Sequence, residues 1–176
     1  MIYFIADTHF DDKNIIPFAN RPFLDIQEMN EHIIIRWNRV VQPDDIVYVL
    51  GDFAHISSDM KNILEHLNGT KYLIRGNHDT CDNAFYREMG FAEVYDKPII
   101  LDDFWILSHE PLFMNDSMPY VNIFGHVHNN PIYADYSKQH FCACVEREKV
   151  SYTPISFIDV KAFIQEKYLE QQNDAE

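Results

Sequence analysis

Metal-binding side chains follow five separate apolar runs of this sequence. Each run has the composition of a β-strand, and an Asp, Asn or His comes within two residues of its end. In α/β proteins, ligands collect outside the carboxyl ends of strands, where short loops project side chains into a common crevice. Carboxylate, amide and imidazole groups bind hard and borderline divalent metals, so the motifs together indicate a metal-dependent enzyme. The five motifs are Asp7-Thr8-His9, Gly51-Asp52, Gly76-Asn77-His78-Asp79, Ser108-His109 and Gly125-His126-Val127-His128.

Each motif alone has an ordinary structural explanation. An aspartate such as Asp52 near a strand end is commonly a turn residue, and His126 and His128 would suit an exposed polar strand. His109 alone would suit a semi-buried histidine with satisfied hydrogen bonds. Five separate strand ends are not expected to acquire ligand-type residues independently, so we interpret the motifs as one site.

The segments between the motifs alternate between strands and helices in the first half of the chain. A polar loop is expected over residues 11–22, and residues 92–150 have the pattern of successive short strands. The expected helices span residues 26–40, 58–68 and 82–89, and a last one begins near Ser156. This order of elements predicts two β-sheets packed together with helices outside them.

The composition limits the classes of protein and partner. The chain of 176 residues has no linker-like segment, so we expect one domain over residues 1–170 and a frayed tail over residues 171–176. The net charge of −14 disfavours nucleic-acid polymers, whose binding depends on clustered Lys and Arg. No apolar run is long enough for a membrane span, and no secretory signal is expected at the N-terminus. Because the three cysteines form no CxxC pair, we expect reduced thiols and a cytoplasmic location.

The order of the five motifs resembles the signature of the calcineurin-like metallophosphoesterase superfamily. The pattern D-x-H, G-D, G-N-H-D, H and G-H-x-H runs from Asp7 to His128. The segment from Phe18 to Asn38, with its Arg21-Pro22-Phe23, is similar to a branch of small stand-alone bacterial and phage phosphoesterases. The resemblance implies an α/β fold of two packed mixed β-sheets flanked by helices, a four-layer αββα sandwich.

The resemblance also implies a dinuclear metal centre. Asp52 would bridge the two ions, as a carboxylate with two oxygens can. The mixed nitrogen and oxygen ligands suit two divalent ions, Mn²⁺ first, with Fe, Zn²⁺, Co²⁺ or Ni²⁺ as alternatives. One ion would be held by Asp7, His9, Asp52 and His128, and the other by Asp52, Asn77, His109 and His126.

By the same resemblance, the protein would hydrolyse phosphate esters. A hydroxide that bridges the metals would attack phosphorus while His78 assists the leaving group. Asp79 would orient the loop that carries His78. Substrate contacts are expected at Arg21, Arg75 and His55. The open alternatives are a surface position for Arg21, a structural ion pair for Arg75 and a solvent-facing loop position for His55.

A small-molecule or nucleotide phosphodiester is the favoured substrate. The chain has little room for a cap domain, so specificity is expected from the loops over residues 10–23, 53–58 and 110–120, and a short, open site fits diesters or generic monoesters. A phosphomonoesterase and a nuclease of the same fold are alternatives. A non-catalytic scaffold that binds protein partners is a third alternative, and the complete set of ligands argues against it. Nothing in the sequence indicates the oligomeric state.

Overall fold

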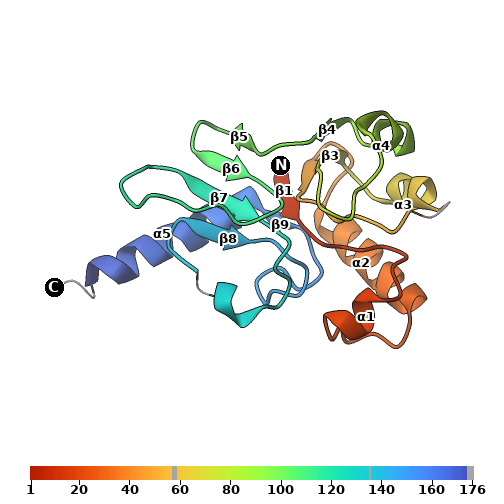
Figure 1. Ribbon diagram of the computed structural model, residues 1–176, viewed down its shortest axis with the longest axis horizontal. Coiled ribbons are helices and arrows are strands. Elements are labelled where there is room, and N and C mark those ends of the chain that lie inside the picture. The colour runs from red at the N-terminus through yellow and green to blue at the C-terminus, as the bar shows by residue number, and fades with distance from the viewer. Residues whose placement is uncertain (57–58, 135, 174–176) are drawn as a thin grey trace.

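The strand-like runs form two mixed β-sheets (Figure 1). The computed structural model describes residues 1–56, 59–134 and 136–173, with side chains described up to residue 170. The first sheet has four parallel strands and an antiparallel edge strand, in the order β4 (Glu93–Tyr95), β3 (Thr70–Ile74), β2 (Ile46–Val49), β1 (Ile2–Ile5) and β9 (Ile155–Ser156). In the second sheet, β5 (Ile99–Leu101) is antiparallel to the parallel strands β6 (Trp105–Leu107), β7 (Val121–Phe124) and β8 (His140–Cys142).

The helices lie close to their predicted positions, with one addition. Asp25 and Asp82 cap α2 and α4 by accepting hydrogen bonds from the N–H groups of Glu28 (2.9 Å) and Phe85 (2.8 Å). The short helix α1 lies inside the segment predicted as a polar loop, because Ile15 is buried in the core and anchors it. The helices are α1 (Ile15–Phe18), α2 (Ile26–Val40), α3 (Met60–His66), α4 (Asn83–Met89) and α5 (Phe157–Asn173), with a 3₁₀ turn η1 at Pro131–Tyr133.

Two sequence predictions fall partly on residues that the structure does not describe. The helix expected over residues 58–68 begins as α3 at Met60, and residues 57–58 lie outside the described residues. The tail predicted over residues 171–176 begins within α5, which continues to Asn173, and residues 174–176 lie outside the described residues. In the described part of the chain, no helix has both the length and the apolar character that a membrane span requires.

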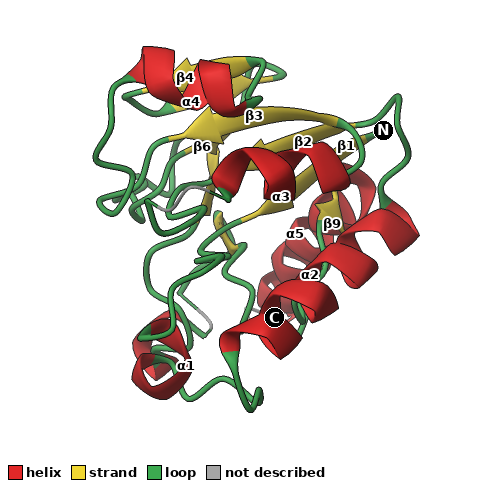
Figure 2. Ribbon diagram, turned by 90° about the vertical axis from the view of Figure 1, so that its right-hand side faces the viewer, coloured by secondary structure: helices red, strands yellow, loops and turns green. Residues whose placement is uncertain are grey.

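The two faces of the first sheet belong to two apolar cores. Tyr3 and Ile5 of β1 pack in one core with residues of α2, α3 and α4, which lie beside β1, β2 and β3 in Figure 2. The alternate residue Phe4 belongs to a second core, which it shares with Ile123 of β7 and Phe157 of α5. Successive residues of a strand point to opposite faces, so one strand supplies both cores. The prediction of an α/β fold with two mixed sheets flanked by helices is confirmed.

Parallel strands of both sheets end where the motifs begin. Strands β1, β2 and β3 of the first sheet and β6 and β7 of the second are each followed by one of the five motifs. Backbone hydrogen bonds join the motif loops: the N–H of Asp7 donates to the carbonyl of Gly51 (3.0 Å), and the N–H of Gly125 donates to the carbonyl of His109 (2.8 Å). The fold therefore gathers polar side chains from both sheets around one point.

Candidate metal centre

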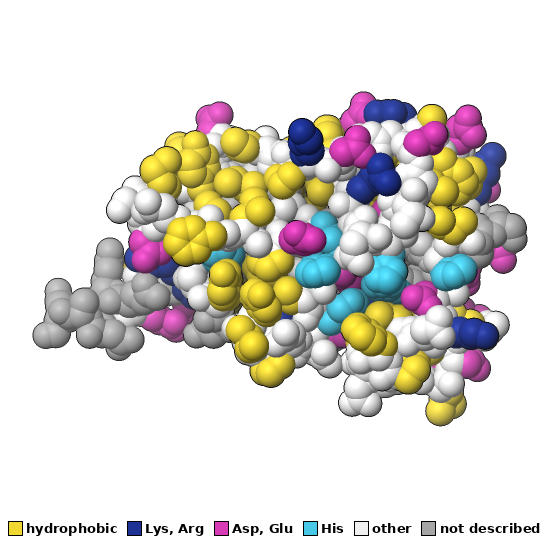
Figure 3. Space-filling view, viewed as in Figure 1, with side chains coloured by type: hydrophobic (Ala, Val, Ile, Leu, Met, Phe, Trp, Pro, Cys, Tyr) yellow, Lys and Arg dark blue, Asp and Glu magenta, His cyan; other side chains and the backbone are white. Residues whose placement is uncertain are grey.

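The motifs meet in two adjoining clusters of ligand atoms. One cluster is formed by Asp7, His9 and His128 and the other by Asp52, His109 and His126, and the ligand atoms of each lie within 4.8 Å of one another. The Oδ2 atom of Asp52 lies 3.7 Å from Nε2 of His9 and 3.4 Å from Nε2 of His109, so it faces both clusters. In Figure 3 several histidine side chains lie close together near the centre of the view, with acidic side chains beside them.

The polar atoms of the second cluster converge around Nε2 of His109. Nδ1 of His109 lies 2.8 Å from the carbonyl oxygen of Leu50, which can only accept, so Nδ1 carries a proton. Nε2 is then an acceptor in the neutral ring, yet it lies 3.0 Å from Oδ1 of Asn77, another acceptor. The same Asn77 oxygen lies 3.0 Å from Nδ1 of His126. Imidazole nitrogens and an amide oxygen that converge in this way form a donor set that a divalent cation can take as ligands.

Unpaired buried atoms mark the first cluster. Oδ1 of Asp7 and Nε2 of His9 are buried and have no hydrogen-bond partner in the described structure. Nε2 of His128 lies 3.8 Å from Oδ1 of Asp7, and its Nδ1 atom lies 2.9 Å from Oε1 of Glu146. A buried polar atom without a partner costs about 1–3 kcal/mol, and coordination to a metal would remove that cost. The donor atoms of both clusters therefore fit divalent ions.

The electrostatics of the site also favour added positive charge. Burial raises the pKa of Asp7 to about 6, although His109 and His128 act to lower it. Burial lowers the pKa of His109, but the hydrogen bond to Asp52 and the charges of Asp7 and Asp52 outweigh it and raise the pKa to about 9. In His9 burial dominates and lowers the pKa to about 4, so its ring is neutral at pH 7. The carboxylates thus stabilise a cation here, whether a proton on His109 or a metal ion.

The backbone has an uncommon conformation at five of the seven predicted ligands. The φ angle is positive at Asp7 (58°), His9 (50°), Asp52 (52°), His126 (70°) and His128 (47°). Residues other than glycine remain in this left-handed region only where surrounding contacts hold them, and they cluster at functional sites. One such contact is the hydrogen bond from the N–H of His126 to Oδ2 of Asp7 (2.8 Å).

Two motif glycines leave room for the carboxylates. A Cβ atom at Gly76 would collide with Oδ1 of Asp52, and a Cβ atom at Gly125 would lie 2.5 Å from Oδ2 of Asp7. Oδ1 of Asp52 accepts a hydrogen bond from the N–H of His78 (2.8 Å). The loops can approach the carboxylates this closely only where no side chain intervenes.

Asp79 lies behind the candidate centre and joins two motif loops. Its buried carboxylate accepts hydrogen bonds from the N–H groups of Asp52 and Gly76, both at 2.8 Å. Burial raises the pKa of Asp79 to about 6, and the hydrogen bond from Gly76 opposes this effect. These contacts suit an orienting role better than metal binding, since both bonds are to backbone N–H groups.

Arg21 also lies behind the centre, and a buried glutamate explains its position. The guanidinium donates to the carbonyl oxygens of Asp7 (2.6 Å) and Thr8 (2.8 Å) and to Oε1 of Glu146 (2.6 Å). The side chains of Arg21 and Glu146 are 0% and 3% exposed. Glu146, which also contacts His128, was missed by the sequence analysis. A signal existed, because Glu146 follows the apolar run over residues 141–145 as the motifs follow theirs.

Arg75 and His55 line separate cavities beside the candidate centre. Arg75 forms an ion pair with Asp96 (2.7 Å) and donates to the carbonyl of Asp79 (2.7 Å), and it borders a cavity of about 400 Å³ that reaches Asn77. His55 is exposed and lines a cavity of about 360 Å³ together with His78. The structure thus places His55 and His78 around one cavity, whereas Arg75 is engaged in structural contacts.

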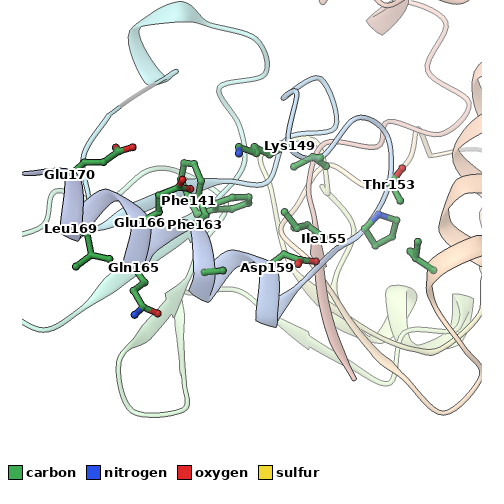
Figure 4. Close-up of a pocket in the computed structure, with 14 residues that line it drawn as sticks. Phe141, Lys149, Thr153, Ile155, Asp159, Phe163, Gln165, Glu166, Leu169 and Glu170 are labelled. Carbon is green, nitrogen blue, oxygen red and sulfur yellow. The ribbon is translucent and has the colours of Figure 1, made fainter.

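A larger cavity lies along α5, away from all of these residues (Figure 4). Its volume is about 930 Å³, and Phe141, Ile155, Phe163 and Leu169 are among its lining residues. None of its described lining residues is a predicted site residue. The chemistry of the ligand atoms, not cavity size, therefore marks the candidate site.

Comparison with known proteins identifies the family. The model of the calcineurin-like phosphoesterase family matches residues 1–153, a stretch that contains all five motifs. The chain belongs to the calcineurin-like phosphoesterase family. As a member of this family it is a metal-dependent phosphoesterase, a hydrolase of phosphoric ester bonds.

Three known proteins are similar to this phosphoesterase in sequence or in structure. It is 40% identical over 132 residues to the uncharacterized protein MJ1445 of Methanocaldococcus jannaschii. This match covers 69% of this chain and 75% of the relative. The crystal structure of the protein of unknown function AQ665 from Aquifex aeolicus superimposes with a TM-score of 0.71 at 30% identity, over 92% of this chain and 98% of that one. The Pseudomonas putida nuclease MPE shares the fold with a TM-score of 0.51 at 24% identity, over 72% of this chain and 61% of that one.

Proposed function

We propose that this protein is a phosphodiesterase that acts on small-molecule or nucleotide diesters at a dinuclear metal centre. The observation that carries the proposal is the position of Asp52, whose Oδ2 atom faces His9 of one cluster and His109 of the other. This position fits a carboxylate that bridges two ions. One ion would be held by Asp7, His9, Asp52 and His128, and the other by Asp52, Asn77, His109 and His126.

The ligand set suits Mn²⁺ first, with Fe, Zn²⁺, Co²⁺ or Ni²⁺ as alternatives, because it mixes imidazole and oxygen donors without a thiolate. When bound, the ions would lower the pKa of water and neutralise negative charge on the phosphoryl oxygens. The chain's own contribution is to fix the donor atoms. The carbonyl of Leu50 orients His109, and Glu146 orients His128.

His78 is the proposed proton donor to the leaving oxygen. Its side chain is exposed, lines the same cavity as His9 and His128, and its ring centroid lies 5.2 Å from that of His9. Its backbone N–H is bound to Asp52, so the ring is held next to the proposed bridging ligand. An imidazole is suited to proton transfer near neutral pH.

The charges around the cavity support a diester over a monoester. The described residues that line it with His78 include Asp12 and no Lys or Arg. A phosphomonoester carries about −1.5 to −2 charges at pH 7, whereas a diester carries one, so a cavity that adds no Lys or Arg to the two proposed metal ions favours the diester. The same lack of Lys and Arg disfavours a nuclease that holds several phosphates, although the P. putida nuclease shows that the fold accommodates one.

The proposal is tested by comparing bis(4-nitrophenyl) phosphate with 4-nitrophenyl phosphate on metal-stripped and Mn²⁺-reconstituted protein. We expect the diester to have the higher kcat/KM and its hydrolysis to depend on added metal. A higher kcat/KM for the monoester would favour a phosphomonoesterase, and degradation of single-stranded DNA at a comparable rate would favour a nuclease. Diester hydrolysis by the stripped protein would contradict the metal assignment.

A further inference from the structure

Phe18 is an apolar side chain that the fold exposes beside the candidate metal centre. It is the last residue of α1 and is 76% exposed, whereas Ile15 of the same helix is buried. Its ring lies edge-on to the ring of His128, with 5.8 Å between the centroids. A single exposed apolar residue is ordinary, so a role for Phe18 must be argued from the cavities that it lines.

Phe18 and His128 border two cavities at once. Each cavity has a volume of about 360 Å³. The first is also lined by His9, Asp12, Asn14, Ile15, His55 and His78. The second is also lined by His126, Val127, Asn129, Asn130 and Tyr133. Both cavities therefore reach the predicted metal ligands and share the edge that Phe18 and His128 form.

The residues of the two cavities favour uncharged occupants with flat faces. Among the described lining residues there is no Lys or Arg, and Asp12 adds a carboxylate to the first cavity. Phe18 and Tyr133 supply aromatic rings. Phosphorus in a diester bears two substituents that leave it in different directions. Two adjoining cavities with a common edge give each substituent its own place.

We propose that Phe18 stacks the base of a nucleoside, so that the preferred substrates are small phosphodiesters with one nucleoside substituent. This inference rests on the proposed phosphodiesterase function. Every base has a flat face that stacks on an aromatic ring, and the loss of one such ring weakens binding by about 5- to 150-fold. Phe18 acts on substrate binding and not on the bond that breaks, so its removal changes KM more than kcat.

The test compares two diesters with the same leaving group on the Mn²⁺-loaded protein: thymidine 5′-(4-nitrophenyl phosphate) and methyl 4-nitrophenyl phosphate. The wild type should have a KM for the thymidine diester about 5- to 150-fold below that for the methyl diester. Phe18→Ala should reduce the ratio of the methyl-diester KM to the thymidine-diester KM by raising KM for the thymidine diester. Phe18→Tyr should keep this ratio. Phe113→Ala removes another exposed phenylalanine (90%) and is the matched control.

Each other outcome overturns part of the reasoning. A ratio that Phe18→Ala leaves intact refutes the role of Phe18 and spares the phosphodiesterase proposal. An equal rise in both KM values means that Phe18 contacts the shared nitrophenyl ring and refutes the assignment to the base. If neither diester is hydrolysed, the phosphodiesterase proposal fails. The role of Phe18 in base stacking is then tested by saturation-transfer NMR of the thymidine diester on the Mg²⁺-loaded protein. Equal binding to the wild type and to Phe18→Ala refutes that role.

Discussion

Replacing Glu146 with alanine removes the acceptor that the side chains of Arg21 and His128 share. Oε1 of Glu146 accepts from Nε (2.9 Å) and Nη2 (2.6 Å) of Arg21 and lies 2.9 Å from Nδ1 of His128. Because both side chains of the ion pair are shielded from water, Glu146→Ala leaves a buried guanidinium without its counter-charge. It also leaves the His128 ring without the partner that fixes its tautomer.

The two effects have separate magnitudes. Breaking a buried ion pair by removing one partner costs about 3–5 kcal/mol. Arg21 keeps its hydrogen bonds to the carbonyls of Asp7 and Thr8, so we expect the lower end, about 3 kcal/mol. For a chain of this size, that corresponds to a fall in Tm of about 6–12 °C in calorimetry of the metal-free protein. Loss of a residue that orients a metal-binding histidine weakens metal affinity by about 10- to 100-fold, which calorimetric titration with Mn²⁺ measures.

Two variants separate the ion pair from the orientation of His128. Glu146→Gln keeps an oxygen acceptor for His128 but not the charge, so it should lose stability and retain more Mn²⁺ affinity than Glu146→Ala. Glu93→Ala breaks the exposed ion pair with Arg87 and should lower Tm far less than Glu146→Ala does. The reasoning fails if Glu146→Ala is no less stable than Glu93→Ala, and the orienting role fails if the Gln and Ala variants lose Mn²⁺ affinity equally.

Three further outcomes are expected. His78→Ala should retain both metal ions and lose about 10²- to 10⁴-fold in kcat for bis(4-nitrophenyl) phosphate. The control variant His66→Ala, which removes an exposed histidine of α3, should match the wild type. Full activity of His78→Ala would show that another group protonates the leaving oxygen. Asp52→Ala should weaken both metal sites, because its Oδ2 atom faces both clusters, and a metal content of two ions per chain by mass spectrometry would disprove the bridging assignment. Chelation of the metals should lower Tm by about 5–11 °C, since an ion at 100 times its Kd stabilises the fold by about 2.7 kcal/mol. A Tm insensitive to chelator and to added Mn²⁺ would contradict metal binding by the folded state.

The sequence alone determined the features that depend on local pattern. The apolar residues of α2 recur every three or four positions, and the structure buries the stripe formed by Met29, Ile33 and Trp37. The five motifs follow strand-like runs, and a parallel arrangement of those strands brings their ends together. The fold class and the family are therefore confirmed. The individual metal ligands and His78 stay predictions, which the convergence of their side chains supports.

Only the tertiary structure decided how residues beside the motifs are used. Arg21 and Glu146 are 125 positions apart, and no local pattern distinguishes an arginine that meets a substrate from one that is buried against a distant carboxylate. In the same way, Phe10 and Phe53 are fully buried whereas Phe18 is exposed, although all three adjoin motif residues or their loops. The nitrogen that each histidine presents is likewise set by a remote acceptor, Leu50 for His109 and Glu146 for His128. Burial and hydrogen bonding depend on contacts between segments far apart in the chain, so these roles follow from packing and not from residue type.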